Sequence, residues 1–192
     1  MLVRPISVAL RPLTNTDLEP IHELLSDWNV VRFMLLPHCE TKAESEKCLR
    51  DLIAENPGAP WHSEVRAIQM QNSGEMIGIC GVSVLQGSET GEIWYLLRPD
   101  FWGRGITTEA ARMLLRIGFA EMKLHRIFAM CLPENPASAR VLEKIGMRKE
   151  GCQRKSLRIH GEWRDCSVYA ILRDEWAASI ESGRMAAAVG QR

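Results

Sequence analysis

The 192-residue sequence predicts an α/β (α+β) fold, in which helices pack around a mixed β-sheet. The first observation behind this prediction is order: one strand pattern, two helix patterns, then strands interleaved with helices. The second is composition, because 46% hydrophobic and 25% charged residues are typical of a chain that buries a core. The third is the absence of any fixed repeat, which excludes a solenoid. We expect a single domain over residues 1–183 and a flexible tail over residues 184–192.

The N-terminal quarter is predicted to hold one strand and two helices. Val8 and Leu10 recur with the period of two that indicates a strand. Residues 16–19 (Thr-Asp-Leu-Glu) have the form of a capping box, so a helix should follow to about residue 27. Residues 41–44 (Thr-Lys-Ala-Glu) form a second capping box, whose helix should end before the Asn-Pro-Gly at 56–58.

The rest of the chain alternates between strand and helix patterns. Residues 65–70 and 76–85 are rich in strand formers and should pair as a hairpin, in which Gly78 and Gly81 indicate a bulge or a close backbone neighbour. The other expected elements are a strand at 93–97, a helix after the glycine turn that follows it, a strand at 126–132, a helix from Asn135 to Gly146, strands at 148–152 and 163–172 joined by a basic loop at 154–160, and a short helix at 173–182.

One glycine-bearing turn, residues 102–110 (Trp-Gly-Arg-Gly-Ile-Thr-Thr-Glu-Ala), carries the strongest functional signal. It connects the apolar strand 93–97 to a helical pattern. Glycines let a backbone approach a ligand closely, and the first turn of a helix presents unpaired N–H groups at its positive end. This combination suits a phosphate, and Arg104 adds a charge for its oxygens. The alternative is a tight strand-to-helix turn that binds no ligand.

The residues of this turn exclude two known phosphate-binding loops, and the overall charge and the cysteine spacing argue against other classes of protein. No Lys follows Gly105, as the GxxxxGK[ST] loop requires, and Thr108 stands where G-x-G-x-x-G has its third glycine. A formal net charge of +0 favours neither nucleic acid nor membrane partners. Six cysteines without a C-x-x-C pair or zinc spacing indicate reduced thiols in a cytoplasmic protein and predict no metal site.

The segment from Pro99 to Ala110 resembles the acetyl-CoA loop of the Gcn5-related N-acetyltransferase superfamily, which reads [Q/R]-x-x-G-x-[G/A]. Residues 124–127 (Leu-His-Arg-Ile), 133–147 (beginning Pro-Glu-Asn-Pro-Ala-Ser) and 161–165 (Gly-Glu-Trp-Arg-Asp) are similar to further signatures of its branch of ribosomal-protein N-terminal acetyltransferases. The matches come in family order and span a little under half of the chain. Thr107 departs from the pattern, because the family usually has Ala or Gly there.

The resemblance implies a seven-stranded mixed sheet, splayed between the fourth and fifth strands, with acetyl-CoA as cosubstrate in the gap. It implies cofactor contacts from the end of the splayed strand, from the glycine loop and from the start of a later helix. The residues at these positions are Leu96, Leu97, Arg98, Trp102, Gly103, Arg104, Gly105, Ile106, Thr107, Thr108, Asn135 and Ser138. For Leu96 and Leu97 the side chains are expected in the core, so the contacts would come from their backbone.

Acetyl transfer to an amine needs a base and help for the leaving thiolate. An α-amino group with a pKa near 8 needs only about 1 kcal/mol to become neutral at pH 7, whereas a lysine needs about 4.6 kcal/mol. Glu92 matches the position of a glutamate base in some relatives, although a strand-end carboxylate or a water relay is the alternative. The resemblance assigns Asn135 to the pantetheine arm and Ser138 to the CoA sulfur. A helix cap and an ordinary first-turn serine are the structural alternatives.

The sequence therefore predicts an N-acetyltransferase that transfers acetyl from acetyl-CoA to a primary amine by direct attack. The branch resemblance favours the α-amino group of a protein N-terminus, including those of ribosomal proteins. A small-molecule amine (an antibiotic, a polyamine or an amino acid) and a non-catalytic acyl-CoA-binding regulator are the alternatives. The sequence leaves both a monomer and a homodimer open.

Overall fold

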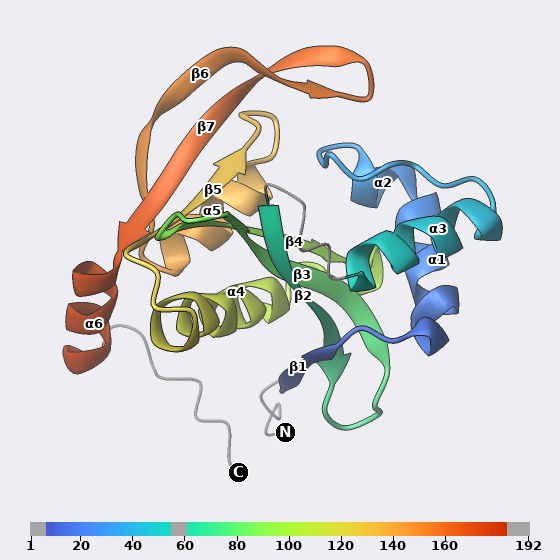
Figure 1. The fold of residues 1–192 in the computed structure, drawn as a ribbon, viewed down its shortest axis with the longest axis horizontal. Helices are drawn as coiled ribbons and strands as arrows, with labels where there is room; N and C mark the ends of the chain where they lie inside the picture. Colours follow the sequence, from blue (N-terminus) through green and yellow to red (C-terminus); the bar gives the residue numbers. More distant parts are fainter. Residues whose placement is uncertain (1–6, 55–60, 184–192) are drawn as a thin grey trace.

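The computed structural model describes residues 7–54 and 61–183, and it contains the expected mixed sheet (Figure 1). Seven strands pair in the order β1-β2-β3-β4-β5-β7-β6, antiparallel throughout except for the parallel pair β4 and β5. The strands are β1 (Val8–Pro12), β2 (Trp61–Met70), β3 (Met76–Leu85), β4 (Thr90–Leu97), β5 (Arg126–Cys131), β6 (Arg148–Ile159) and β7 (Glu162–Leu172). The tail predicted at 184–192 lies outside the described residues.

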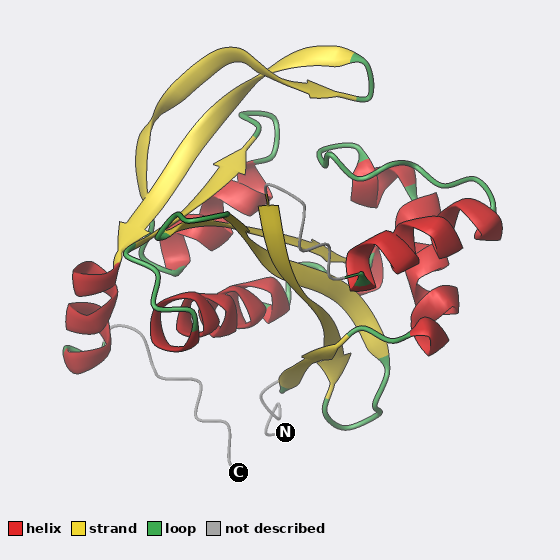
Figure 2. Cartoon of the chain, in the orientation of Figure 1, coloured by secondary structure: helices red, strands yellow, loops and turns green. Residues whose placement is uncertain are grey.

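The helices lie in two groups, one on each side of the sheet (Figure 2). One group follows β1, and the other is interleaved with the later strands. The helices are α1 (Leu18–Ser26), α2 (Trp28–Val31), α3 (Lys42–Ile53), α4 (Ile106–Arg116), α5 (Pro136–Lys144) and α6 (Arg173–Glu181). A π-helical turn, Ile117–Glu121, continues α4. In the described part of the chain, no helix is long and apolar enough to cross a membrane.

The two groups of helices bury two separate hydrophobic cores. One core joins α4 and α5 to one face of the sheet through residues such as Ile93, Leu114 and Leu142. The other joins α1, α2 and α3 to the opposite face through residues such as Leu24 and Leu96. Because side chains alternate along a strand, neighbouring residues of β4 belong to different cores. The sheet therefore separates two compartments, and β4 contributes side chains to both.

The sheet opens between its two parallel strands. β4 pairs with β5 only at Thr90↔Arg126, Gly91↔Ile127 and Glu92↔Phe128, although β4 continues to Leu97 and β5 to Cys131. Beyond Glu92 the two strands diverge, while β3 stays paired with β4 up to Leu97. The expected splay between the fourth and fifth strands is confirmed, and Glu92 lies at its apex.

The first helix is capped differently from the sequence prediction. Thr14, rather than Thr16, precedes the helical segment, and its backbone N–H donates to Oδ2 of Asp17 at 2.8 Å. Asp17 also accepts two hydrogen bonds from Arg11, at 2.6 and 2.8 Å. The buried Asp17 thus joins β1 to α1 as an ion pair, and this pairing with Arg11 and Thr14 lowers the pKa of its carboxyl despite the burial that raises it.

The expected loop at 154–160 is wrong, because residues 154–159 are part of β6 and only His160 lies in the turn. β6 and β7 form a long hairpin that turns at His160 and Gly161, whose φ angles are 46° and 86°. The sequence pattern missed it because nearly every residue of β6 is exposed, so hydrophobic alternation is absent. At the tip, His160 Nε2 donates to the carbonyl of Val31 at 3.0 Å, and its ring lies 4.7 Å from that of Trp28. The hairpin therefore reaches across to α2 (Figure 1).

The two glycines of β3 are explained by close neighbours: the predicted close backbone neighbour is found at Gly78, whereas the neighbour of Gly81 is a side chain. A Cβ on Gly81 would lie 2.7 Å from the Trp94 ring, and one on Gly78 would collide with the backbone of Leu96. A register shift on the paired strand lies between Ile68 and Gln69, next to Gly78. These contacts fix the course of β4 where it leaves β5.

Candidate active site

The glycine turn is fastened to the end of β4 by its own tryptophan. The indole Nε1 of Trp102 donates to the carbonyl of Leu97 at 2.7 Å. A single 3-10 turn, Pro99–Phe101, fills the space between them, and the backbone N–H of Trp102 donates to the carbonyl of Pro99 at 3.0 Å. Trp102 was predicted to offer its backbone N–H to the cofactor, but that group is already used within the turn.

Gly103 and Gly105 are required by backbone conformation. Their φ angles are 73° and 79°, in the left-handed region that residues with a Cβ rarely adopt. A Cβ at either position would meet nothing within 4 Å, so crowding within the chain does not explain them. The open space beside the two glycines leaves the backbone accessible from outside.

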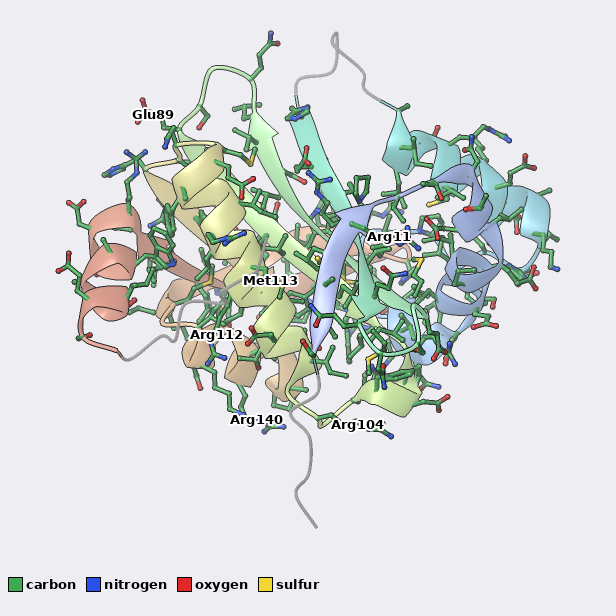
Figure 3. The ribbon with its side chains drawn as sticks, turned by 90° about the horizontal axis from the view of Figure 1, so that it is seen from below. Arg11, Glu89, Arg104, Arg112, Met113 and Arg140 are labelled. Carbon is green, nitrogen blue, oxygen red and sulfur yellow. The ribbon has the colours of Figure 1, made fainter. Side chains whose placement is uncertain are left out.

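The turn and the start of α4 present a row of free backbone donors. Among the described residues, no acceptor pairs with the N–H groups from Gly103 to Thr108, which agrees with the unpaired first turn of a helix. The Arg104 guanidinium lies 5.5 Å from the centre of the Phe101 ring. In Figure 3, Arg104 and Arg140 lie along the same lower edge of the molecule. Free N–H groups beside arginines suit an anion such as a pyrophosphate.

The backbone of β4 offers fewer free groups than predicted. The N–H of Arg98 donates to the carbonyl of Ile77 on β3 at 2.9 Å. Because hydrogen-bonded pairs alternate along an antiparallel ladder, the pair Ile79↔Leu96 is also bonded to β3. Leu96 and Arg98 therefore face β3, whereas Leu97 and Tyr95 direct their backbone N–H groups into the splay. The Arg98 side chain is engaged as well, since it lies 2.7 Å from Glu75.

The start of α5 faces the same splay. Asn135 caps the helix, because its Oδ1 accepts from the N–H of Ser138 at 3.1 Å. Its side-chain NH2 group has no partner among the described residues, so cap and ligand donor are compatible roles. Ser138, one turn into the helix, directs its hydroxyl toward β4. Both residues thus lie beside the splay, and their expected contacts with the pantetheine arm and the sulfur stay predictions.

Tyr95 contacts the start of α5 across the splay, and the sequence had not marked it as a site residue. Its hydroxyl lies 2.9 Å from Ser138 Oγ and 3.4 Å from the Ser138 carbonyl. Burial raises the pKa of the Tyr95 hydroxyl well above its usual value, partly offset by the hydrogen bond to Ser138. The two residues are 43 positions apart, and only the fold brings them together. The pair bridges the splay from β4 to α5.

Glu92 directs a titratable side chain to the other face of β4, opposite to Tyr95. Counting along β4, it shares a face with Trp94 and Leu96, both of which pack against the core of α1, α2 and α3. No hydrogen bond or ion pair holds its carboxylate within the described residues. Burial raises its pKa to about 7, since water is removed and no cation replaces it. A carboxyl with this pKa changes protonation near neutral pH.

Around the splay the chain thus combines a row of free N–H groups, two polar side chains at the start of α5 and a carboxyl that titrates near pH 7. No metal-binding group of His, Cys, Asp or Glu occurs in residues 7–54 and 61–183. This arrangement suits transfer of an acyl group from a phosphate-bearing carrier. The comparison with protein families agrees, since the model of an acetyltransferase (GNAT) domain matches residues 7–148. The chain belongs to the GNAT family and is an acetyl-CoA-dependent N-acetyltransferase.

Individual relatives cover almost the whole chain. An uncharacterized N-acetyltransferase of Bacillus subtilis, YnaD, is 35% identical over 87% of this chain and 94% of its own. The spermidine N(1)-acetyltransferase of Escherichia coli is 26% identical over 90% of this chain and 89% of its own. The solved structure of Mycobacterium smegmatis RimJ in complex with CoA-disulfide has a TM-score of 0.77 and 25% identity, covering 92% of this chain and 90% of that one.

Proposed function

We propose that this enzyme acetylates the α-amino group of a protein N-terminus, with Glu92 as general base and Ser138 as hydrogen-bond donor to the leaving thiolate. The amine gives up a proton to Glu92, its nitrogen attacks the thioester carbon, and the carbon–sulfur bond breaks with its electron pair on sulfur. The acceptor binds as an ammonium, so two protons are left on nitrogen after Glu92 has taken one; one of them leaves to solvent and the other stays on the product amide. The observation that carries this proposal is the position of Glu92 at the last β4–β5 pair, where the strands diverge and where partial burial without a cation raises its pKa to about 7.

Acetyl-CoA binding is assigned to the residues with free groups. The N–H groups of Gly103, Arg104, Gly105, Ile106, Thr107 and Thr108 would hold the pyrophosphate, and Asn135 would donate to the pantetheine arm. The outward N–H groups of Leu97 and Tyr95 are suited to the pantetheine amides and to the thioester oxygen. Trp102, Leu96 and Arg98 support this cradle through their contacts with Leu97 and β3.

The strength of Glu92 as a base favours an α-amino group as the acceptor. An α-amino group with a pKa near 8 is deprotonated by a carboxylate of pKa about 7 at a cost of about 1.4 kcal/mol. For a lysine near 10.4 the cost is more than three times as large. A single buried carboxyl with no further base therefore suits an α-amine better than a lysine or a polyamine.

The charge of the surroundings also disfavours a polyamine. The hairpin from Arg148 to Leu172 carries six Lys and Arg against three Asp and Glu, so it repels a polycation. On the facing helix, Glu19 is paired with Lys42 at 2.8 Å and Glu23 with Arg98 at 3.5 Å. These carboxylates are thus already neutralised within the chain. A peptide with one terminal ammonium and acidic or neutral side chains suits these charges better than a polyamine does.

The test is an acceptor screen with acetyl-CoA, read as free thiol released and as acetyl groups gained by mass spectrometry. The panel holds peptides that begin with Ala or Ser, the same peptides with a blocked N-terminus, a blocked peptide with one internal lysine, and spermidine. We expect kcat/KM to be highest for the free N-terminal peptides and turnover to disappear on blocking. A preference for spermidine or for the internal lysine would overturn the assigned acceptor.

A further inference from the structure

The Tyr95–Ser138 contact joins the two arms of the splayed sheet at the depth where the thioester is expected. Tyr95 comes from β4, three residues beyond the last pair with β5. Ser138 comes from α5, which follows β5 in the chain. Their hydroxyl oxygens lie 2.9 Å apart, which is a full hydrogen bond between two arms that the backbone no longer joins.

Either hydroxyl can be the donor in this hydrogen bond, and a second contact is compatible with donation from Tyr95. The Tyr95 hydroxyl also lies 3.4 Å from the Ser138 carbonyl, which can only accept. A tyrosine proton shared between the carbonyl and Oγ satisfies both contacts, and this is the arrangement that the proposal below uses. Tyr95 stays protonated in this role, because burial raises the pKa of its hydroxyl. With a lone pair of Oγ accepting from Tyr95, the proton of the serine hydroxyl must point elsewhere.

One neighbouring sulfur competes for that proton in the absence of a ligand. A serine in a helix often donates back to a carbonyl of the preceding turn, but Ser138 makes no such bond to a described residue. Its backbone N–H is held by Asn135 at 3.1 Å, which fixes the residue at the start of α5. The Cys131 thiol lies within hydrogen-bond reach of the Ser138 side chain, while its own S–H is directed at the carbonyls of Leu132 and Asn135, each at 3.4 Å from Sγ.

We propose that Tyr95 is a positioning residue, which orients the Ser138 hydroxyl so that its proton faces the departing CoA sulfur. The tyrosine touches neither the amine nor the thioester carbon through its side chain; it acts through the serine. Donation from Tyr95 also polarises the serine O–H and strengthens the bond that it gives to the thiolate. The inference rests on the proposed role of Ser138 and adds the residue that aligns it.

The first test is a double-mutant cycle with Tyr95→Phe, Ser138→Ala and the double variant, using the peptide that the acceptor screen selects. We expect Tyr95→Phe to lower kcat about ten-fold, since one hydrogen bond is lost, with little change in the KM for acetyl-CoA. In the Ser138→Ala background, the same change should have almost no further effect. Equal, additive losses in both backgrounds would show that Tyr95 acts independently of Ser138 and would overturn the proposal.

Tyr169→Phe is the matched control. Tyr169 is the other tyrosine of the chain; it is buried in the core against which the partly buried Tyr95 packs. Its hydroxyl has no hydrogen-bond partner among the described residues, so removing it should leave kcat within about two-fold of wild type. A ten-fold loss in this variant as well would mean that kcat responds to any change in this core, and the specific role of Tyr95 would fall.

A second measurement needs no acceptor. The thiol pKa of bound CoA can be followed through the ultraviolet absorbance of its thiolate, with desulfo-CoA as the blank for the protein's own cysteines. We expect the wild type to lower this pKa relative to free CoA, and both Tyr95→Phe and Ser138→Ala to raise it again. An unshifted CoA pKa in the wild type would overturn the alignment of Ser138. A wild type that shifts the CoA pKa but acetylates no N-terminal peptide would refute only the proposed acceptor.

Discussion

The two sides of β4 bury their polar groups in opposite ways. On the α4–α5 side, Tyr95 is partly buried with a partner, Ser138, and the burial of its hydroxyl keeps it protonated. On the α1–α3 side, Glu92 is partly buried without a hydrogen bond or ion pair to a described residue, and this burial raises its pKa to about 7. Burial with a partner produces a fixed dipole, whereas burial without one produces a group that titrates. One strand can thus provide both an orienting donor and a base.

The largest effect is expected on acetyl-CoA binding, when the glycine turn on the α4–α5 side is blocked. Gly105→Trp should weaken acetyl-CoA binding more than about 100-fold, because the side chain would fill the space beside the free N–H groups and strain a φ of 79°. Calorimetric titration with acetyl-CoA measures it. Gly87→Trp is the control, since Gly87 also has a positive φ, of 76°, and open space, but lies in the β3–β4 turn. Equal losses in both variants would refute the cofactor site.

The next largest effect is expected on the α1–α3 side of β4, where replacing Glu92 should change the free energy of unfolding in a pH-dependent way. The folded Glu92 pKa of about 7 exceeds its ordinary 4.5, so the folded protein holds this proton more tightly. The contribution of Glu92 to stability is therefore most favourable below about pH 4.5 and falls as pH rises to 7, by about 3 kcal/mol at most. Glu92→Gln should be more stable than wild type by about 2–3 kcal/mol at pH 8 and by under about 1 kcal/mol at pH 5.

Urea unfolding at both pH values measures this difference. Glu89→Gln is the control, because Glu89 lies in the preceding turn and is exposed (Figure 3). It should change the free energy of unfolding by no more than about 0.5 kcal/mol at either pH. A pH-independent effect of Glu92→Gln would contradict the raised pKa of this carboxyl.

A smaller effect is expected where the hairpin meets α2. His160→Asn keeps a residue that tolerates the φ of 46° but removes the ring contact with Trp28. If the hairpin borders the acceptor, the KM for the peptide should rise about three- to ten-fold through looser positioning of that wall. Steady-state kinetics measures this change. The dissociation constant of acetyl-CoA should not change, and a parallel loss of both affinities would contradict two separate compartments.

The smallest effect is expected at Arg104. Arg104→Gln should weaken acetyl-CoA binding about three- to five-fold, because an exposed charge contributes little and salt screens it. Titrations at low and high salt measure this, and the difference from wild type should shrink at high salt. Arg116→Gln is the control, as an exposed arginine at the other end of α4. An equal loss of acetyl-CoA affinity in Arg116→Gln would show that the Arg104 variant acts through the net charge of the protein and not through a local contact.

The parts of the molecule that the sequence predicted are those with local signals. The glycine turn combines a strand, two glycines and a helix start within a few residues, so its geometry follows from the residues themselves. The Tyr95–Ser138 pair has no such signal, because a contact across 43 residues depends on the splay of the sheet. The Asp17 ion pair with Arg11 and the exposed strand β6 were missed for similar reasons. One depends on a neighbouring strand, and the other carries no hydrophobic pattern.

The most direct test of the proposed mechanism is the pH dependence of kcat/KM for the preferred peptide, in wild type and in Glu92→Gln. In the wild type, kcat/KM should fall as pH drops through about 7, where Glu92 takes up its proton. Protonation of the substrate amine gives a separate decrease of kcat/KM at low pH, called here the limb of the amine. Glu92→Gln should be about 100-fold slower at pH 8 and should keep only the limb of the amine. An unchanged rate and profile in Glu92→Gln would show that this carboxyl is not the base.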